Sequence, residues 1–215
     1  MDADWVSAYS EAATAVCTLG LVVGVVVQFR QLHQQLSDVK EQIGLTKKAI
    51  EGETYRHLEE KFFHSEAMIN ARYEAARDLL ELRKIIDSAQ SAERVAFVKK
   101  DHHAFIELAG FFDYIGSLVR LGMIDKNAVY SSFYRKCCAF WQAGVPIIKD
   151  RRENPKEGES QDETRLLWTD FESLSKILRE EHVKTLAEVH PHEVRRGDLK
   201  DETCLEVLKQ EAKIK

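Results

Sequence analysis

The sequence predicts an all-α protein with a single N-terminal transmembrane helix, a coiled-coil-like stalk and a cytoplasmic helical bundle. Three observations support this fold class. Residues 12–29 carry no charge, and apolar residues then recur at alternating spacings of four and three from Leu32 to Ile50. Only three prolines and ten glycines punctuate 215 residues, and no stretch shows the alternation of a strand. We expect a membrane helix (1–29), a stalk (30–52), a bundle (53–190) and a polar tail (191–215).

Residues 12–29 are just long enough to cross a thin bilayer. About 18 residues at ~1.5 Å each span roughly 27 Å, and Trp5 and Tyr9 precede them, where interfacial aromatic residues belong. The charged residues before the segment are all acidic, whereas the basic residues Arg30, Lys40, Lys47 and Lys48 follow it. The positive-inside rule therefore places the N-terminus outside and the larger part in the cytoplasm. A buried core helix of a soluble protein is the alternative.

Small residues form one stripe of this helix, at spacings of four, three and four. Small side chains let helix backbones approach closely within a bilayer, so the stripe predicts a helix–helix contact. Its members are Ala13, Cys17, Gly20 and Gly24. The hydroxyls of Thr14 and Thr18 either face a pore in a ring of helices or bond their own backbone.

The stalk carries a narrow apolar seam. Leu32, Leu36, Val39 and Ile43 alternate by four and three, and Thr46 and Ile50 continue the register. Heptad spacing of this kind is typical of a coiled coil, whereas a helix that lies on a globular core usually shows a broader apolar face. We therefore expect the seam to join copies of the chain.

Beyond Gly52, which we expect to interrupt the stalk, apolar periodicity predicts further helices over about 54–86, 92–121, 126–146 and from 164 onward. In the second of these, Val95, Phe105, Leu108, Phe112, Ile115 and Val119 are expected on one buried face. Gly122 is placed to end that helix, Asp125 to cap the next, and Pro146 to mark its far end. The charged stretch 150–163 is predicted to be a mobile loop.

The composition points away from several function classes. Charged residues make up 31% of the chain with both signs mixed, and the net charge is −5, so we expect no direct nucleic-acid binding. No Gly-rich phosphate loop, nucleophile elbow, HExxH or CxxC occurs. We therefore predict a protein that is not an enzyme, without catalytic residues, cofactor or metal.

Two neighbouring histidines keep alternatives open. His103 and Glu107 lie one helical turn apart, which is a spacing that two metal ligands can use. Small helical ribonucleases pair an arginine and a histidine that have four to six residues between them, and this chain has no such pair. A divergent ribonuclease that uses His102 and His103 remains the enzymatic alternative.

The run from Glu107 to Asp125, with the phrases Phe-Phe-Asp-Tyr-Ile-Gly and Leu-Gly-Met-Ile-Asp, is followed by Trp141, Arg152 and Phe171-Glu-Ser-Leu174. These residues resemble a bacterial family of unknown function whose members have one N-terminal membrane helix, a Gln-rich helical stalk and a small helical domain. The layout is also similar to the membrane accessory proteins of type VI-B CRISPR systems, which assemble into rings around a pore. The resemblance implies a bacterial inner-membrane protein that serves antiviral defence.

Together these observations predict a membrane-anchored homo-oligomer that forms or gates a membrane pore as an antiviral defence effector. Its expected partners are the lipid bilayer, further copies of the chain, and an RNA-guided nuclease or another cytoplasmic defence protein. The alternative is a membrane-tethered helical scaffold that recruits a cytoplasmic partner without conduction.

Overall fold

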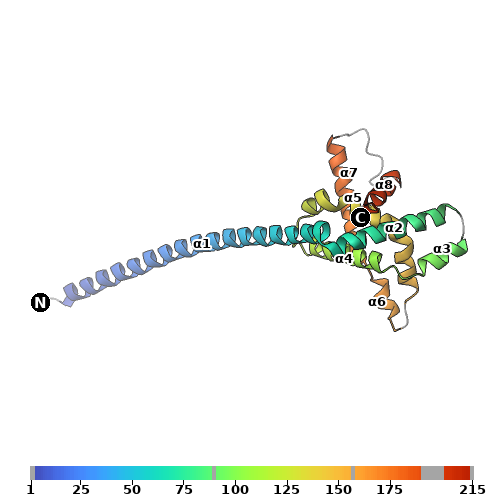
Figure 1. Ribbon diagram of the computed structural model, residues 1–215. Coiled ribbons are helices and arrows are strands. Elements are labelled where there is room, and N and C mark those ends of the chain that lie inside the picture. The colour runs from blue at the N-terminus through green and yellow to red at the C-terminus, as the bar shows by residue number, and fades with distance from the viewer. Residues whose placement is uncertain (1–2, 89–90, 156–157, 190–200, 214–215) are drawn as a thin grey trace. The chain divides into compact units, whose positions relative to one another are not determined.

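Every regular element of the computed structural model is a helix within the residues it describes, which are 3–88, 91–155, 158–189 and 201–213. The side chains of residues 3–23, 26, 91, 188–189 and 201 lie outside that description. The expected all-α class is confirmed. The elements are α1 (Ala3–His64), α2 (Glu66–Asp87), α3 (Ser91–Val98), α4 (His103–Arg120), α5 (Lys126–Glu153), α6 (Gln161–Arg165), α7 (Thr169–Val189) and α8 (Asp201–Glu211) (Figure 1).

The chain divides into two units, Met1–Ile50 and Glu51–Lys215. The first unit is a stretch of α1. The expected interruption at Gly52 is wrong, because α1 continues through this exposed glycine to His64. A glycine in an exposed helix costs about 1 kcal/mol, which a long helix tolerates. The chain turns instead at Ser65, whose extended backbone (φ −72°, ψ 125°) separates α1 from α2.

The helix expected over 92–121 is two helices. Residues 99–102 separate α3 from α4, and His102 at the break has a non-helical backbone (φ −103°, ψ 58°). Val95 was expected inside and is 54% exposed, because short α3 packs on α2 through Phe97 instead. The expected inner face of α4 is confirmed, since Phe105, Leu108, Phe112 and Ile115 are fully buried and Val119 partly so.

Local signals set the boundary between α4 and α5 as expected. Gly122 has a positive φ of 66°, and the amide of Met123 donates to the carbonyl of Leu118 across 2.9 Å, as in a Schellman motif. The side chain of Asp125 accepts from the amide of Asn127 at 2.9 Å and caps α5. Pro146, in contrast, lies inside α5, which continues to Glu153. The expected loop over 150–163 is therefore shorter and is followed by α6.

The core of the second unit forms around α4, which packs mainly on α7 and α2, while α5 packs on α7 and α8. Phenylalanine rings fill its centre. Phe62 from α1 lies 5.2 Å from the ring of Phe111 in α4 and 5.2 Å from the ring of Phe133 in α5. Phe112 stacks on Phe171 of α7 at 5.1 Å. Rings from four helices therefore share one apolar centre.

Residues 201–213 are not part of a polar tail. They form α8, which packs against α5 and α2 and buries Cys204, Val207 and Leu208 (Figure 1). Its last residue, Glu211, is 3% exposed and accepts from the guanidinium of Arg72 at 2.7 Å and from the ammonium of Lys136 at 2.8 Å. A buried carboxylate between two cations explains why this charged segment docks, since each charge keeps a partner inside the protein.

Helices α4 and α7 cross so closely that the crossing admits only glycine. A Cβ added at Gly116 of α4 would lie far inside van der Waals contact with the carbonyl oxygen of Asp170 in α7. The Asp170 carboxylate also accepts two hydrogen bonds from Arg120, at 2.9 and 3.0 Å, one turn further along α4. The crossing therefore combines a close backbone contact with a bidentate ion pair.

Gly116→Ala should destabilise the second unit by about 1–3 kcal/mol, because the new methyl group has to push α7 away. Gly110→Ala is the matched control in the same helix, since a Cβ there meets nothing within 4 Å. It should stabilise the unit by roughly 0.5–1 kcal/mol through helix propensity. Urea unfolding of the two variants measures the difference, and equal stabilities would contradict the close crossing.

Candidate functional site

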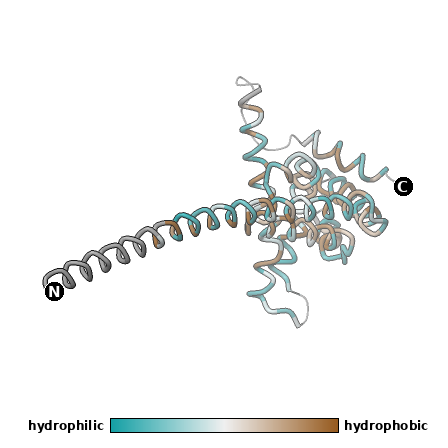
Figure 2. Tube along the Cα trace, turned by 90° about the vertical axis from the view of Figure 1, so that its left-hand side faces the viewer, coloured by the Kyte–Doolittle hydropathy of each residue, from teal (hydrophilic) through white to brown (hydrophobic). Residues whose placement is uncertain are grey.

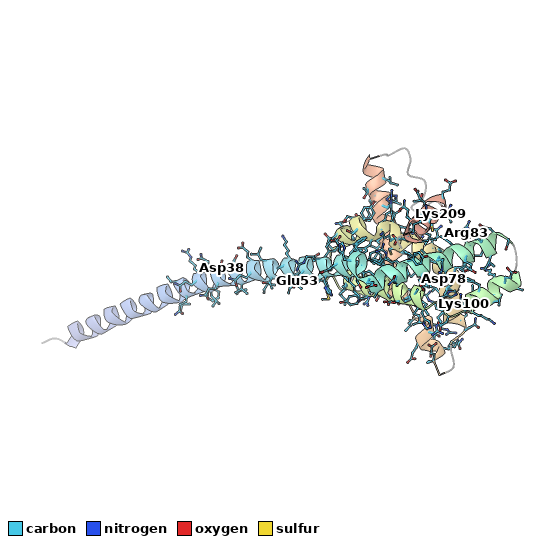
Figure 3. All side chains as sticks on the ribbon, in the orientation of Figure 1. Asp38, Glu53, Asp78, Arg83, Lys100 and Lys209 are labelled. Atoms are coloured by element: carbon cyan, nitrogen blue, oxygen red, sulfur yellow. The ribbon has the colours of Figure 1, made fainter. Side chains whose placement is uncertain are left out.

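One face of the stalk carries an exposed seam of five aliphatic residues and one threonine, made of Leu32, Leu36, Val39, Ile43, Thr46 and Ile50. The five aliphatic members are 57%, 51%, 51%, 63% and 54% exposed in chain order. Figure 3 shows side chains around the labelled Asp38 pointing outward all round the helix, and Figure 2 shows mostly hydrophilic residues along the coloured part of this stretch. The seam is thus an ordered row of aliphatic side chains on an otherwise polar helix.

A row of this kind is unusual for a surface that stays in water. Single exposed aliphatic residues are normal, but aligned apolar residues at heptad spacing are typical of a helix that packs against another helix. Between residues 24 and 50 the structure buries none of the described side chains, so no described part of this unit covers the seam. Its geometry suits association with a further helix.

The sequence also predicted packing residues ahead of the seam. The side chains of Ala13, Cys17 and Gly20, and those of Thr14 and Thr18, lie outside the described residues. Gly24 is described, is exposed, and has open space where a Cβ would stand. Over the part of the chain that was described, none of the helices combines the length and the apolar character needed to cross a bilayer.

The two histidines that the sequence singled out lie in different surroundings. His102 is 1% exposed; its Nε2 donates to the carbonyl of Phe97 at 2.9 Å, and its Nδ1 lies 3.3 Å from the carboxylate of Asp78. His103 has an 85% exposed side chain beside Asp101. Both ring nitrogens of His102 are occupied, so this residue joins the α2–α3 region to the start of α4 and has no nitrogen left for a substrate.

No metal centre emerges among the described residues. They contain no group of three histidine, cysteine or acidic side chains that is arranged to hold an ion. His103 and Glu107 are both exposed at the start of α4, and a pair of ligands is too few for a stable site. Burial raises the pKa of the Cys137 thiol, which therefore stays protonated and unreactive.

A second polar cluster surrounds His182 of α7. Its Nδ1 pairs with the hydroxyl of Tyr130 at 2.9 Å, and its ring stacks on Tyr134 at 4.4 Å. Burial lowers the pKa of His182, with a further contribution from Arg135, and burial raises the pKa of Tyr134. These shifts arise because α5 and α7 pack closely together around the cluster and exclude water from it.

The residues that carried the family resemblance build the crossing of α4 and α7. The carboxylate of Asp113 accepts from the backbone amide of Phe171 at 2.9 Å, although burial raises the pKa of this acid. Arg152 donates to the carbonyl of Leu167 at 2.9 Å and to Glu172 at 3.0 Å. These polar side chains hold the start of α7, just after Trp168, whose φ is +56°. Their roles here are structural.

The profile of one protein family matches residues 18–178, and its description is a domain of unknown function, DUF4760. The chain belongs to the DUF4760 family. No curated protein and no solved structure matches the chain. The DUF4760 match contains the whole seam and α2 to α6, and it ends within α7, so α8 lies beyond it. The expected membership of a family of unknown function is confirmed, whereas the membrane and defence roles stay predictions.

His102→Ala should destabilise the second unit by about 2–4 kcal/mol, because it leaves Asp78 and the Phe97 carbonyl without their buried partner. His103→Ala is the neighbouring control and should change stability by less than about 0.5 kcal/mol. Thermal or urea unfolding measures both. RNA cleavage by residues 51–215 that disappears in His103→Ala, with the fold intact, would contradict this structural interpretation and restore the ribonuclease alternative.

Proposed function

We propose that this DUF4760 protein is a membrane-anchored homo-oligomer that forms or gates a membrane pore. The exposed seam carries the proposal. Five aliphatic side chains, each at least half exposed, share one face of a helix over 19 residues of chain. A second copy of the same seam buries them by knobs-into-holes packing, because an identical row of heptad-spaced aliphatic residues is complementary to itself.

Anchoring rests on the segment directly before the seam. Residues 12–29 lack charge, aromatic residues precede them, and basic residues follow. The backbone is helical through this segment and into the seam. Copies that are joined at the seam and run in the same direction have their uncharged segments at the same end of the assembly, which is the condition for building a pore from one helix per copy. The small-residue stripe then provides close contacts within the bilayer.

The biological role follows from the resemblance to membrane accessory proteins of type VI-B CRISPR systems. On that resemblance the protein is an antiviral defence effector of the bacterial inner membrane. The second unit lies in the cytoplasm, where it receives a signal from an RNA-guided nuclease or another defence protein. Polar side chains dominate its surface, as a soluble partner requires.

A membrane-tethered scaffold without conduction is the second candidate, and one surface favours it. A groove of about 260 Å³ lies between α2, α5 and α8. Apolar side chains such as Leu82, Ile86 and Leu205 line it, and Arg83, Asp87 and Glu202 surround them. An apolar groove with a charged rim is a common docking site for a partner protein. In this case the bundle recruits the partner, and the N-terminal segment only tethers the bundle to the membrane.

Association through the seam is tested by the mass of the full chain in mild detergent. Leu36→Ser combined with Ile43→Ser should raise the dissociation constant of the oligomer at least about a hundredfold, because two buried aliphatic layers are lost. Leu45→Ser is the control. Leu45 is as exposed as Ile43, at 61% against 63%, but it lies off the seam, so its loss should leave association unchanged. Residues 53–215 alone should be monomeric. A full chain that is monomeric in mild detergent would contradict the proposal.

Conduction is tested with the full chain in dye-loaded vesicles of bacterial lipid. Gly20→Leu combined with Gly24→Leu should reduce dye release at least about tenfold, because bulky side chains keep the membrane helices apart. The control is Val22→Leu with Val26→Leu, which changes residues on the opposite side of the same helix and leaves the small-residue stripe unchanged. Undiminished release from the glycine variant would argue against the pore. Biological activity that survives replacement of residues 12–29 by an unrelated membrane helix would favour the scaffold.

A further inference from the structure

The residues that flank the seam differ in kind on its two sides. In heptad notation Leu36, Ile43 and Ile50 occupy position a, and Leu32, Val39 and Thr46 occupy position d. Position e, which follows d, then contains His33, Lys40 and Lys47. Position g, which precedes a, contains Gln28, Gln35 and Gln42, and then Ala49 before Ile50. One flank is therefore basic, and the other is an uncharged row of three amides that ends in an alanine.

The six polar flanking side chains are exposed, so they are available to a second helix. They lie where a coiled coil brings its partners together, because e and g residues border the buried a and d layers. Acidic residues of the same stretch take other positions: Asp38 is at c and Glu41 at f, away from the seam. The polar side chains that the flanks offer a partner are therefore lysine, histidine and glutamine, with no acidic residue among them.

Orientation decides which of these side chains meet. In a parallel pair each g residue faces the e residue five positions later in the partner, so Gln35 meets Lys40 of the second copy and Gln42 meets its Lys47. In an antiparallel pair e faces e and g faces g, so lysine meets lysine along one flank. Like charges at this distance repel, whereas an amide oxygen accepts a hydrogen bond from an ammonium group.

We propose that the seam pairs with a second copy of this chain in parallel and in register, and that the unlike basic and glutamine flanks set this orientation. This inference rests on the self-association proposed above and adds its direction. Parallel register brings residue 29 of each copy to the same level, so the segments that precede it leave the coiled coil side by side. The flanks therefore arrange the copies for joint entry into one bilayer.

Gln35→Glu combined with Gln42→Glu distinguishes the two orientations by the sign of its effect. In the parallel pair each new carboxylate faces a lysine of the partner, so the dissociation constant of the full chain should fall about tenfold at low ionic strength. Salt at 1 M should remove most of this gain. In an antiparallel pair the new carboxylates face one another and the constant should rise, which would overturn the proposal.

Gln31→Glu combined with Gln34→Glu is the matched control. It adds the same charge to the same helix at positions c and f, which do not border the seam. The dissociation constant should change less than about twofold. A gain equal to that of the flank variant would overturn the proposal, because it would show a response to net charge and not to facing residues.

Cysteine cross-linking tests register directly, with Leu32→Cys or Ile50→Cys in the full chain carrying Cys17→Ser. The described native cysteines, Cys137, Cys138 and Cys204, are buried. In the parallel arrangement each variant alone forms a disulfide-linked dimer on mild oxidation. Linkage that occurs only when the two variants are mixed would show an antiparallel pair and overturn this inference while the proposed oligomer stands. A monomeric chain without linkage would overturn both.

Discussion

The crossing of α4 and α7 is the constraint on which the second unit depends. Gly116 allows the carbonyl of Asp170 to approach the backbone of α4, and the same aspartate pairs with Arg120. Asp113, on the adjoining face, accepts from the first turn of α7. Once these contacts hold α7 against α4, Phe112 and Phe171 stack and the rings of neighbouring helices close the core around them. Polar contacts at the edge thus determine how the apolar centre packs.

A second constraint joins α1, α2 and α8. Arg72 is 3% exposed. Its guanidinium donates hydrogen bonds to the carboxylate of Glu211 and to the carbonyl of Phe62, and it lies 4.6 Å from the centroid of the Phe62 ring. A cation buried to this degree needs every one of these partners. The helix that supplies the carboxylate, α8, lies beyond the region that defines the DUF4760 family. In this chain the end of α8 thus completes a buried site that begins in α1 and α2.

The two units use apolar residues in opposite ways. In the second unit the aliphatic and aromatic residues turn inward and several helices share them. In the first unit the seam residues stay about half exposed on a single helix, and a narrow a/d row is the pattern by which identical helices associate. The proposed assembly rests on this difference, because no described residue of the first unit buries the seam. In the proposal, the polar flanks of the seam set the direction in which the second copy runs.

Sequence alone determined the helical class, the seam, and the boundary at Gly122 and Asp125. These features depend on periodicity and on caps that act within a few residues, so they can be recognised without a fold. Tertiary structure decided the rest. The chain turns at Ser65 and not at Gly52, α5 continues through Pro146, and α8 docks, because contacts between distant residues outweigh local preferences of about 1–3 kcal/mol. His102 shows the same limit: its place beside His103 suggests a catalytic residue, and only its burial against Asp78 and Phe97 reveals a structural one.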